Sequence, residues 1–216
     1  MLEDHVRPPI AFRSKVHLLK WGRRNQLLFK KLGRRNEQQV VCLVGSVTGE
    51  NYLWPYSQVW ARADYKYYRN ACNFVLTKRH GFTVDSNTQD VDHAVSKSYL
   101  LRHWPDAWVN ILYVDSTLNR SVGSMLEKTM PAPQRPVIEF NIQSLLKILF
   151  DKSENENLNT KNLTDYFYRA ASRLILTSED QKFQSHADSA RLLLFEIWNE
   201  HFPGQMMEIP ADTIPA

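Results

Sequence analysis

The hydrophobic positions in the first third of the chain predict a helix, a strand and a second helix. In residues 16–35, leucines and aromatic residues recur at roughly helical intervals among basic residues, which predicts a basic amphipathic helix. Residues 39–46 form a short β-branched run, which predicts a buried strand. Residues 46–55 contain turn-forming Gly, Glu and Asn and end in a proline, so we expect a loop there. Residues 57–80 then predict a helix that ends before Gly81.

The middle of the chain predicts two further strands followed by a helix. Residues 82–84, residues 91–95 and the apolar run at 108–114 can each contribute to a strand. Asp115 and Ser116 are good N-capping residues, and the apolar positions after them fit a helix. A β-hairpin followed by a helix brings its first strand and the first turn of the helix together, so we expect a small functional site here.

The C-terminal part of the chain is predicted to be helical. Three prolines in residues 130–137 indicate a stiff linker. Beyond the linker, helices are expected at 138–150, 163–176 and 184–202. The sequence therefore predicts four parts: a basic α/β N-terminal region at 1–81, a central core at 82–130, a proline-rich linker at 131–137 and a helical C-terminal region at 138–216.

Positive charge is concentrated toward the N-terminus. Residues 1–80 hold 15 Lys and Arg against 5 Asp and Glu, whereas residues 81–216 hold 12 against 18. A basic segment of this kind suits a polyanion, because each neutralised phosphate releases counterions. A solvated basic face is the alternative, and charge alone does not separate the two.

Residues 57–80 interleave aromatic and basic side chains, an arrangement that binds nucleic acid by stacking on bases and pairing with phosphates. The alternative is that the aromatic residues face the core and the basic residues lie on the solvent-exposed side of the helix. For the aromatic residues, helical spacing favours this alternative. The candidate phosphate contacts are Arg62, Lys66, Arg69, Lys78 and Arg79, together with Lys97 in the central part of the chain.

Several other classes of protein are disfavoured. The two cysteines, Cys42 and Cys72, form neither a disulfide framework nor a zinc-binding pair, and we expect both to be buried thiols. No apolar run approaches the roughly 20 residues that span a bilayer. The N-terminus also lacks the layout of a secretory signal. We therefore expect no membrane partner and a cytoplasmic location.

Asp90, Asp92, His93 and Asn119 are candidates for a metal-dependent hydrolytic site. Oxygen atoms of Asp92 and Asn119 suit a hard cation such as Mg²⁺, with Asp90 as an auxiliary ligand. His93 suits a general base because imidazole titrates near neutral pH. Adjacent strand residues point to opposite faces, so the backbone has to bend if Asp92 and His93 serve one site. The alternative is a turn carboxylate, a core histidine and an incidental helix residue.

The stretches DVDHAVSKSYL and VNILYVDSTLNRS resemble the signature of the HNH, or ββα-metal, endonucleases. The resemblance implies an α+β fold in which a ββα-metal HNH core is embedded in a mainly helical protein. It implies that Asp92 ligates one divalent cation, Mg²⁺ or else Mn²⁺, and that His93 activates water. In the same resemblance, Asn110 fixes the His-bearing loop through side-chain hydrogen bonds, Asn119 is the metal ligand of the helix, and Arg120 contacts phosphate.

The resemblance covers roughly residues 82–128 and departs from the family pattern at several positions. Many members have Pro two residues after the His, where this chain has Val95. Many have a Gly-Lys pair soon after the last Asn, where this chain has Ser-Val-Gly at 121–123. The zinc-binding cysteine pairs of many members are absent. These departures affect phosphate binding and leave the candidate catalytic residues Asp92, His93 and Asn119 in place.

The leading hypothesis from the sequence is a metal-dependent endonuclease that hydrolyses phosphodiester bonds of DNA and leaves a 5′-phosphate. Such a protein serves in phage biology, in defence, or as a toxin delivered into a target cell by a non-classical route. The alternatives are a non-catalytic nucleic-acid-binding or interaction protein on a degenerate HNH scaffold, and a structural partner protein. The C-terminal helices are candidates for binding a protein partner or an inhibitor.

Overall fold

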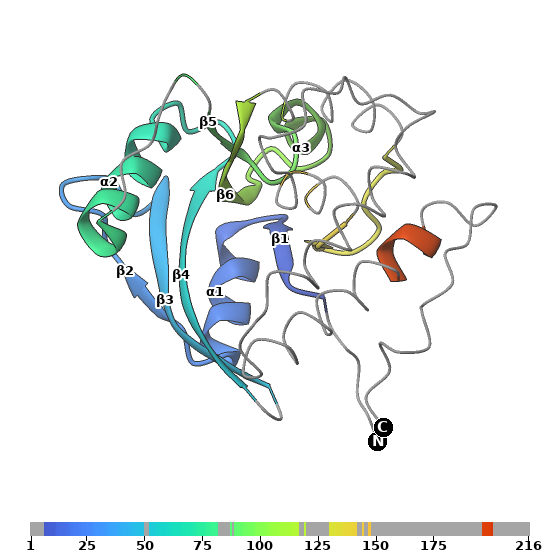
Figure 1. Cartoon of the computed structure of the whole chain (residues 1–216). Coiled ribbons are helices and arrows are strands. Elements are labelled where there is room, and N and C mark those ends of the chain that lie inside the picture. Colours follow the sequence, from blue (N-terminus) through green and yellow to red (C-terminus); the bar gives the residue numbers. More distant parts are fainter. Residues whose placement is uncertain are drawn as a thin grey trace.

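The chain folds around a curled antiparallel sheet of seven strands, shown in Figure 1. The computed structural model describes residues 7–49, 52–81, 87, 89–116, 119, 130–141, 144, 147 and 196–200. The strands are β1 (Pro9–Phe12), β2 (Leu28–Lys30), β3 (Val40–Gly49), β4 (Tyr52–Arg62), β5 (Gln89–His93), β6 (Trp108–Asp115) and β7 (Val137–Glu139). The helices with assigned bounds are α1 (Lys15–Arg24), α2 (Tyr68–His80) and α3 (Lys97–His103).

Strand β6 is the centre of the sheet. The strand order is β2-β3-β4-β6-β1-β7, and β5 also pairs with β6. Ile111 of β6 is aligned with Val59 of β4 and with His93 of β5. Since β1 pairs only with the start of β6, β5 and β1 follow each other along one edge of β6, and β4 occupies the other edge. Neighbours on both edges are consistent with the nearly continuous apolar sequence of β6.

The sheet has two buried faces because successive strand residues point to opposite sides. On β3, Val40 and Cys42 pack in the cluster that includes α2, whereas Val41 and Leu43 pack in the cluster that includes α1. Trp60 of β4 is fully buried on the α1 face. Helices α1 and α2 therefore cover opposite faces of the sheet.

The predicted helix at 16–35 is confirmed only in its first half. Helix α1 ends at Arg24, and the chain then forms β2, in which Phe29 is aligned with Leu43 of β3. The ring of Phe29 packs against Gly22 of α1 and fills the space that a side chain at that position would need. The helical spacing of the later leucines is overridden by strand pairing.

The predicted loop at 46–55 and the first part of the predicted helix at 57–80 are wrong. Strands β3 and β4 run through both segments as one long antiparallel pair. Trp60 shows the reason, because it is aligned with Val41 of β3 on one side and with Asn110 of β6 on the other. Pairing on both edges outweighs the local helical spacing.

The second part of that prediction is confirmed. Helix α2 ends at Gly81, which adopts the left-handed conformation with φ of 64°. The Gly81 amide donates to the carbonyl of Leu76, and this bond closes the last turn of the helix. Glycine tolerates this conformation without the strain that a Cβ atom introduces.

The predicted ββα-metal core inside a mainly helical protein is wrong. Strands β5 and β6 are antiparallel neighbours, but they belong to the same sheet as β1 to β4. Strand β7, from residues expected to lie in the linker and the C-terminal helical region, pairs with β1 through Val137 and Ile138. The protein is α+β, with its strands gathered into one large sheet by pairing between distant segments.

Of the helices expected after residue 138, the structure describes only parts. Ser144 and Lys147 are helical, and so are residues 196–200. The helix expected at 163–176 lies outside the described residues. No described helix has the length and apolar character needed to cross a membrane.

Candidate functional site

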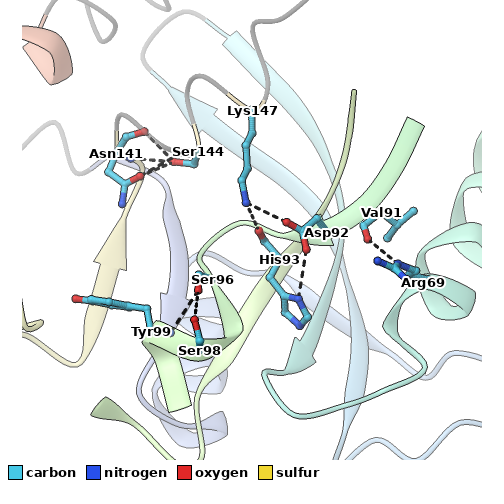
Figure 2. Close-up of polar contacts among 10 residues, drawn as sticks. All are labelled: Arg69, Val91, Asp92, His93, Ser96, Ser98, Tyr99, Asn141, Ser144 and Lys147. Atoms are coloured by element: carbon cyan, nitrogen blue, oxygen red, sulfur yellow. Dashed lines mark hydrogen bonds and ion pairs between the residues drawn. The ribbon is translucent and has the colours of Figure 1, made fainter. Parts of the chain in front are cut away.

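The candidate site lies at the end of β5, where Asp92 and His93 follow each other (Figure 2). His93 is only 3% exposed, and its ring packs against Tyr68 of α2 with the ring centroids 4.2 Å apart. Figure 2 shows the carboxylate of Asp92 between Lys147 and the imidazole of His93. The two adjacent side chains therefore contact each other although both belong to one strand.

Lys147 is the partner of Asp92 that the sequence did not predict. Its Nζ donates to Oδ2 of Asp92 at 3.0 Å and to the carbonyl oxygen of His93 at 3.0 Å. The lysine is 2% exposed. A buried ammonium needs hydrogen-bonding partners and a negative charge, and this contact supplies both.

The helical segment that carries Lys147 is fixed at its start. The amide of Asn141 donates to Oγ of Ser144 at 2.9 Å, and the amide of Ser144 donates to Oδ1 of Asn141 at 3.2 Å (Figure 2). This reciprocal pair has the pattern of a capping box, which satisfies two free amides at a helix start. Lys147 follows Ser144 by three positions and so lies on the same side of the helical segment.

The environment of Asp92 keeps its carboxyl group ionised. Burial works to raise the pKa of Asp92, but the nearby imidazole of His93 and the ammonium of Lys147 outweigh burial and hold that pKa well below its usual range. Oδ1 of Asp92 lies 3.7 Å from Nδ1 of His93, which is a close electrostatic contact rather than a hydrogen bond. The site therefore contains a stable, partly buried negative charge.

The other nitrogen of His93 has no hydrogen-bond partner among the described residues. Nε2 of His93 is buried, and the ring that carries it lies against Tyr68. Burial raises the pKa of Tyr68, and the charges of Asp92 and Asp90 add to this effect. A buried ring nitrogen without a partner is a hydrogen-bonding atom left for a ligand that reaches it.

Asn110 lies close to His93 in the sheet but turns its side chain elsewhere. Nδ2 of Asn110 donates to Oε1 of Gln58 at 2.6 Å, and Asn110 is aligned with Trp60 on the α1 face. His93 is aligned with Ile111, the next residue of β6. The amide of Ala94 donates to the carbonyl of Asn110 at 2.9 Å, so Asn110 holds the His-bearing segment through its main chain.

The structure does not join the remaining predicted ligands to Asp92. Asn119 is helical and partly buried, and no hydrogen bond links it to Asp92 or His93 among the described residues. Asp90 is aligned with Val114 and is also partly buried. Arg120 lies outside the described residues.

The described residues do not fit the divalent cation that the resemblance implies. A hard cation needs several oxygen ligands around it, but one oxygen of Asp92 is held by the Lys147 ammonium. No group of three or more His, Cys, Asp or Glu side chains with the geometry of a metal site occurs in the described part of the chain. The site is built around an ion pair between Asp92 and Lys147.

The predicted phosphate contacts fall into two classes. Arg62 is neutralised by an ion pair with Asp64. Lys66, Lys78, Arg79 and Lys97 are exposed, and Arg69 is exposed while donating to the carbonyl of Val91 at 3.3 Å. Among the described residues, none of these five exposed cations pairs with a carboxylate at ion-pair distance. They remain available to an anionic ligand.

Basic residues 31–35, which the sequence placed in a helix, lie beside α2. Nη2 of Arg35 donates to the carbonyl of Asn70 at 3.0 Å, and its guanidinium lies 4.9 Å from the ring centroid of Phe74. A Cβ atom on Gly33 would lie 3.8 Å from the same ring. In Figure 1 this loop follows β2 and lies next to α2. Only this long-range packing reveals that residues 31–35 and α2 form one surface.

Exposed aromatic residues lie on the same side of α2 as this loop. Tyr67 is 53% exposed and Phe74 is 36% exposed. Tyr67, Phe74 and Lys78 are separated by seven and four positions, so they share one side of the helix. We define the α2 surface as Tyr67, Phe74 and Lys78 together with Lys31, Arg34 and Arg35 of the loop. By contrast, Trp60 and Tyr65 are buried, as the alternative for the aromatic residues predicted.

Comparison of the chain with protein-family models, with curated proteins and with solved structures gives no match. The resemblance to HNH endonucleases therefore rests on the quoted residues alone. The function has to be argued from the Asp92 site and from the α2 surface.

Proposed function

We propose that this protein binds single-stranded nucleic acid, DNA in the first instance, through the α2 surface. The observation that carries the proposal is the placement of two exposed aromatic rings, Tyr67 and Phe74, among cations that form no ion pair with a carboxylate of the described residues. Rings of this kind stack on bases of any sequence, while neighbouring cations bind the phosphates between the bases.

The charge of the surrounding region supports this ligand. In the described residues from 7 to 81, Glu37 and Asp64 are the acidic side chains, against 15 Lys and Arg. Asp64 is already paired with Arg62. Helices α1 and α2 contain no acidic residue. A region of this composition attracts a polyanion and repels a cationic partner.

The aromatic residues distinguish the α2 surface from the other basic face. Helix α1 presents Lys20, Arg23 and Arg24 to solvent on the opposite face of the sheet, but its exposed apolar residue is Val16. A charged helix without exposed rings is typical of a solvated surface. Helix α1 therefore supplies a matched control for charge without stacking.

The test compares two charge-removal variants of the full chain by fluorescence anisotropy with a labelled single-stranded oligonucleotide. One variant carries Lys31→Gln, Arg34→Gln and Lys78→Gln on the α2 surface. The control carries three equivalent changes in α1, which are Lys20→Gln, Arg23→Gln and Arg24→Gln.

The two variants have the same net charge but are expected to bind differently. Each lost phosphate contact removes about 0.7 from the slope of log affinity against log salt for a single strand, so the α2 variant should lose roughly 2 in slope. The α1 control should stay within about 1 of the wild-type slope. Equal losses in both variants would show that binding is not localised, and no binding by the wild-type protein at low salt would refute the proposal.

A second candidate function is cleavage of the bound strand, with His93 as the general base. It is favoured by the buried Nε2 of His93, which lacks a partner among the described residues, and by the ionised Asp92 beside Nδ1. A negative charge near one imidazole nitrogen favours a proton on that nitrogen, which leaves the other nitrogen able to accept a proton. Since His93 is 3% exposed, the substrate reaches Nε2 only if neighbouring residues move aside.

Cleavage is tested with plasmid DNA and single-stranded oligonucleotides in EDTA, Mg²⁺ and Mn²⁺. We expect the wild-type protein to cleave its substrate, His93→Ala to abolish cleavage, and His103→Ala, which alters a partly buried histidine of α3, to retain it. Activity that survives His93→Ala would exclude His93 as the base. Binding without cleavage under every condition would exclude the cleavage function and support binding only.

A further inference from the structure

The ammonium of Lys147 occupies a central position in the Asp92 site. Its Nζ lies 3.0 Å from a carboxylate oxygen of Asp92 and 3.0 Å from the carbonyl oxygen of His93. The lysine is 2% exposed, so water does not replace these partners freely. Its helical segment is held by the reciprocal bonds between Asn141 and Ser144.

A buried ammonium and a bound divalent cation make the same demands on this site. Both need oxygen atoms with negative or partial negative charge, and a carboxylate and a main-chain carbonyl meet that need. Both also lower the cost of keeping Asp92 ionised away from water. They exclude each other, because two positive centres would have to share the same two oxygens.

We propose that Lys147 takes the structural place of the divalent cation that the HNH resemblance assigns to Asp92. The ammonium ties the end of β5 to the helical segment at Ser144 and Lys147, and it fixes the carboxylate that lies beside His93. The site is then assembled without metal, and Asp92 binds a divalent cation only when the lysine charge is removed. This inference is independent of nucleic-acid binding by the α2 surface.

The first test measures Mn²⁺ binding and thermal unfolding of the full-length wild-type protein and of Asp92→Asn, which keeps the shape of the side chain. We expect the two proteins to have the same Mn²⁺ isotherm, and the wild-type unfolding midpoint to be the same in EDTA and in millimolar Mn²⁺. A wild-type Mn²⁺ site that is lost in Asp92→Asn would overturn the proposal. This comparison does not depend on whether a lysine variant folds.

The second test uses Lys147→Met, which keeps the length of the side chain and removes its charge, with the exposed Lys20→Met as the control. We expect the unfolding midpoint of Lys147→Met in EDTA to fall by about 6 °C or more, because the partly buried carboxylate of Asp92 loses its partner. Mn²⁺ should restore part of this loss, and the added change Asp92→Asn should abolish the restoration. Lys20→Met should behave as the wild type.

Two results with Lys147→Met contradict the proposal. An unfolding midpoint equal to that of the wild type in EDTA would show that the ammonium does not hold the site together. A lowered midpoint that Mn²⁺ does not raise would show that the ammonium and a cation are not interchangeable at Asp92. Lys147→Arg, which retains the charge, should lie between Lys147→Met and the wild type and should not respond to Mn²⁺.

Discussion

Stacking on Tyr67 should contribute to nucleic-acid affinity without contributing to its salt dependence. Tyr67 precedes the first turn of α2 and is 53% exposed. Its ring makes an edge contact with Tyr65 at a centroid distance of 5.9 Å, and Nζ of Lys66 lies 5.3 Å from its centroid. These contacts orient the ring and leave about half of its surface open to a base.

The loss of affinity on removing the ring of Tyr67 is estimated for one stacked base. One base stacked on one aromatic side chain is worth about 1–3 kcal/mol on alanine substitution. Tyr67→Ala should therefore weaken binding by roughly 5-fold to 150-fold, since about 1.4 kcal/mol corresponds to a factor of ten. The salt slope should not change, because no phosphate contact is lost.

The assay is fluorescence anisotropy with a single-stranded oligonucleotide over a series of salt concentrations. Tyr67→Trp, which retains a stacking ring, should bind as tightly as the wild type. Val16→Ala serves as the control, because Val16 is 70% exposed on α1 and lies on the opposite face of the sheet. The thermal unfolding midpoint of each variant, measured in parallel, separates lost binding from lost folding.

Two results would show that the ring of Tyr67 does not stack on a base. If Tyr67→Ala binds as tightly as the wild type, the exposed ring is not a stacking platform. If it weakens binding and also reduces the salt slope, the ring acts by holding a cation such as Lys66 rather than by stacking. Each outcome is read from the same titration.

Three further predictions concern stability and reactivity. Burial, with a smaller effect of Cys42, raises the pKa of Cys72 to about 12. Iodoacetamide at pH 8 should therefore label Cys72 only after the protein unfolds, and rapid labelling of the native protein would contradict this. Gly81→Ala should lower the free energy of unfolding by about 1–2 kcal/mol because of the left-handed φ at the end of α2, and Gly81→Asn should lower it by less. If Gly81→Ala and the wild type are equally stable in chemical denaturation, Gly81 does not cap the helix. Asp92→Asn should cost about 3–5 kcal/mol at neutral pH by leaving Lys147 unpaired. The pKa of Asp92 in the folded protein lies below its ordinary value of 3.8, so the difference in free energy of unfolding between the wild type and Asp92→Asn should shrink as the pH falls below 3.8. A difference that stays constant in acid unfolding curves would contradict the ion pair.

Local signals in the sequence predicted some elements of the fold correctly. The β-branched run at 39–46 and the apolar run at 108–114 are strands, and the glycine at position 81 ends a helix. Residues 57–62 were assigned to a helix because aromatic and apolar positions recur there at helical intervals. They form a strand because β3 and β6 pair with them on both edges, and such pairing involves residues that are distant in the sequence.

The candidate site was predictable only in part. The adjacency of Asp92 and His93 is visible in the sequence, and the structure retains it. Lys147 lies 55 positions after Asp92 and 54 after His93, and no local pattern in the sequence connects it to them. A lone lysine inside the run SLLKILF was the available signal, since such a residue either reaches solvent or finds a buried carboxylate.

The most direct test of the nucleic-acid surface is photo-crosslinking from defined positions. A photoreactive benzoylphenylalanine replaces Tyr67 in one protein and Val16 in another, and both are irradiated with a labelled single-stranded oligonucleotide. We expect a covalent protein–DNA product from position 67 and none from position 16, although Val16 is the more exposed of the two. Equal crosslinking from both positions, or crosslinking from position 16 alone, would contradict it.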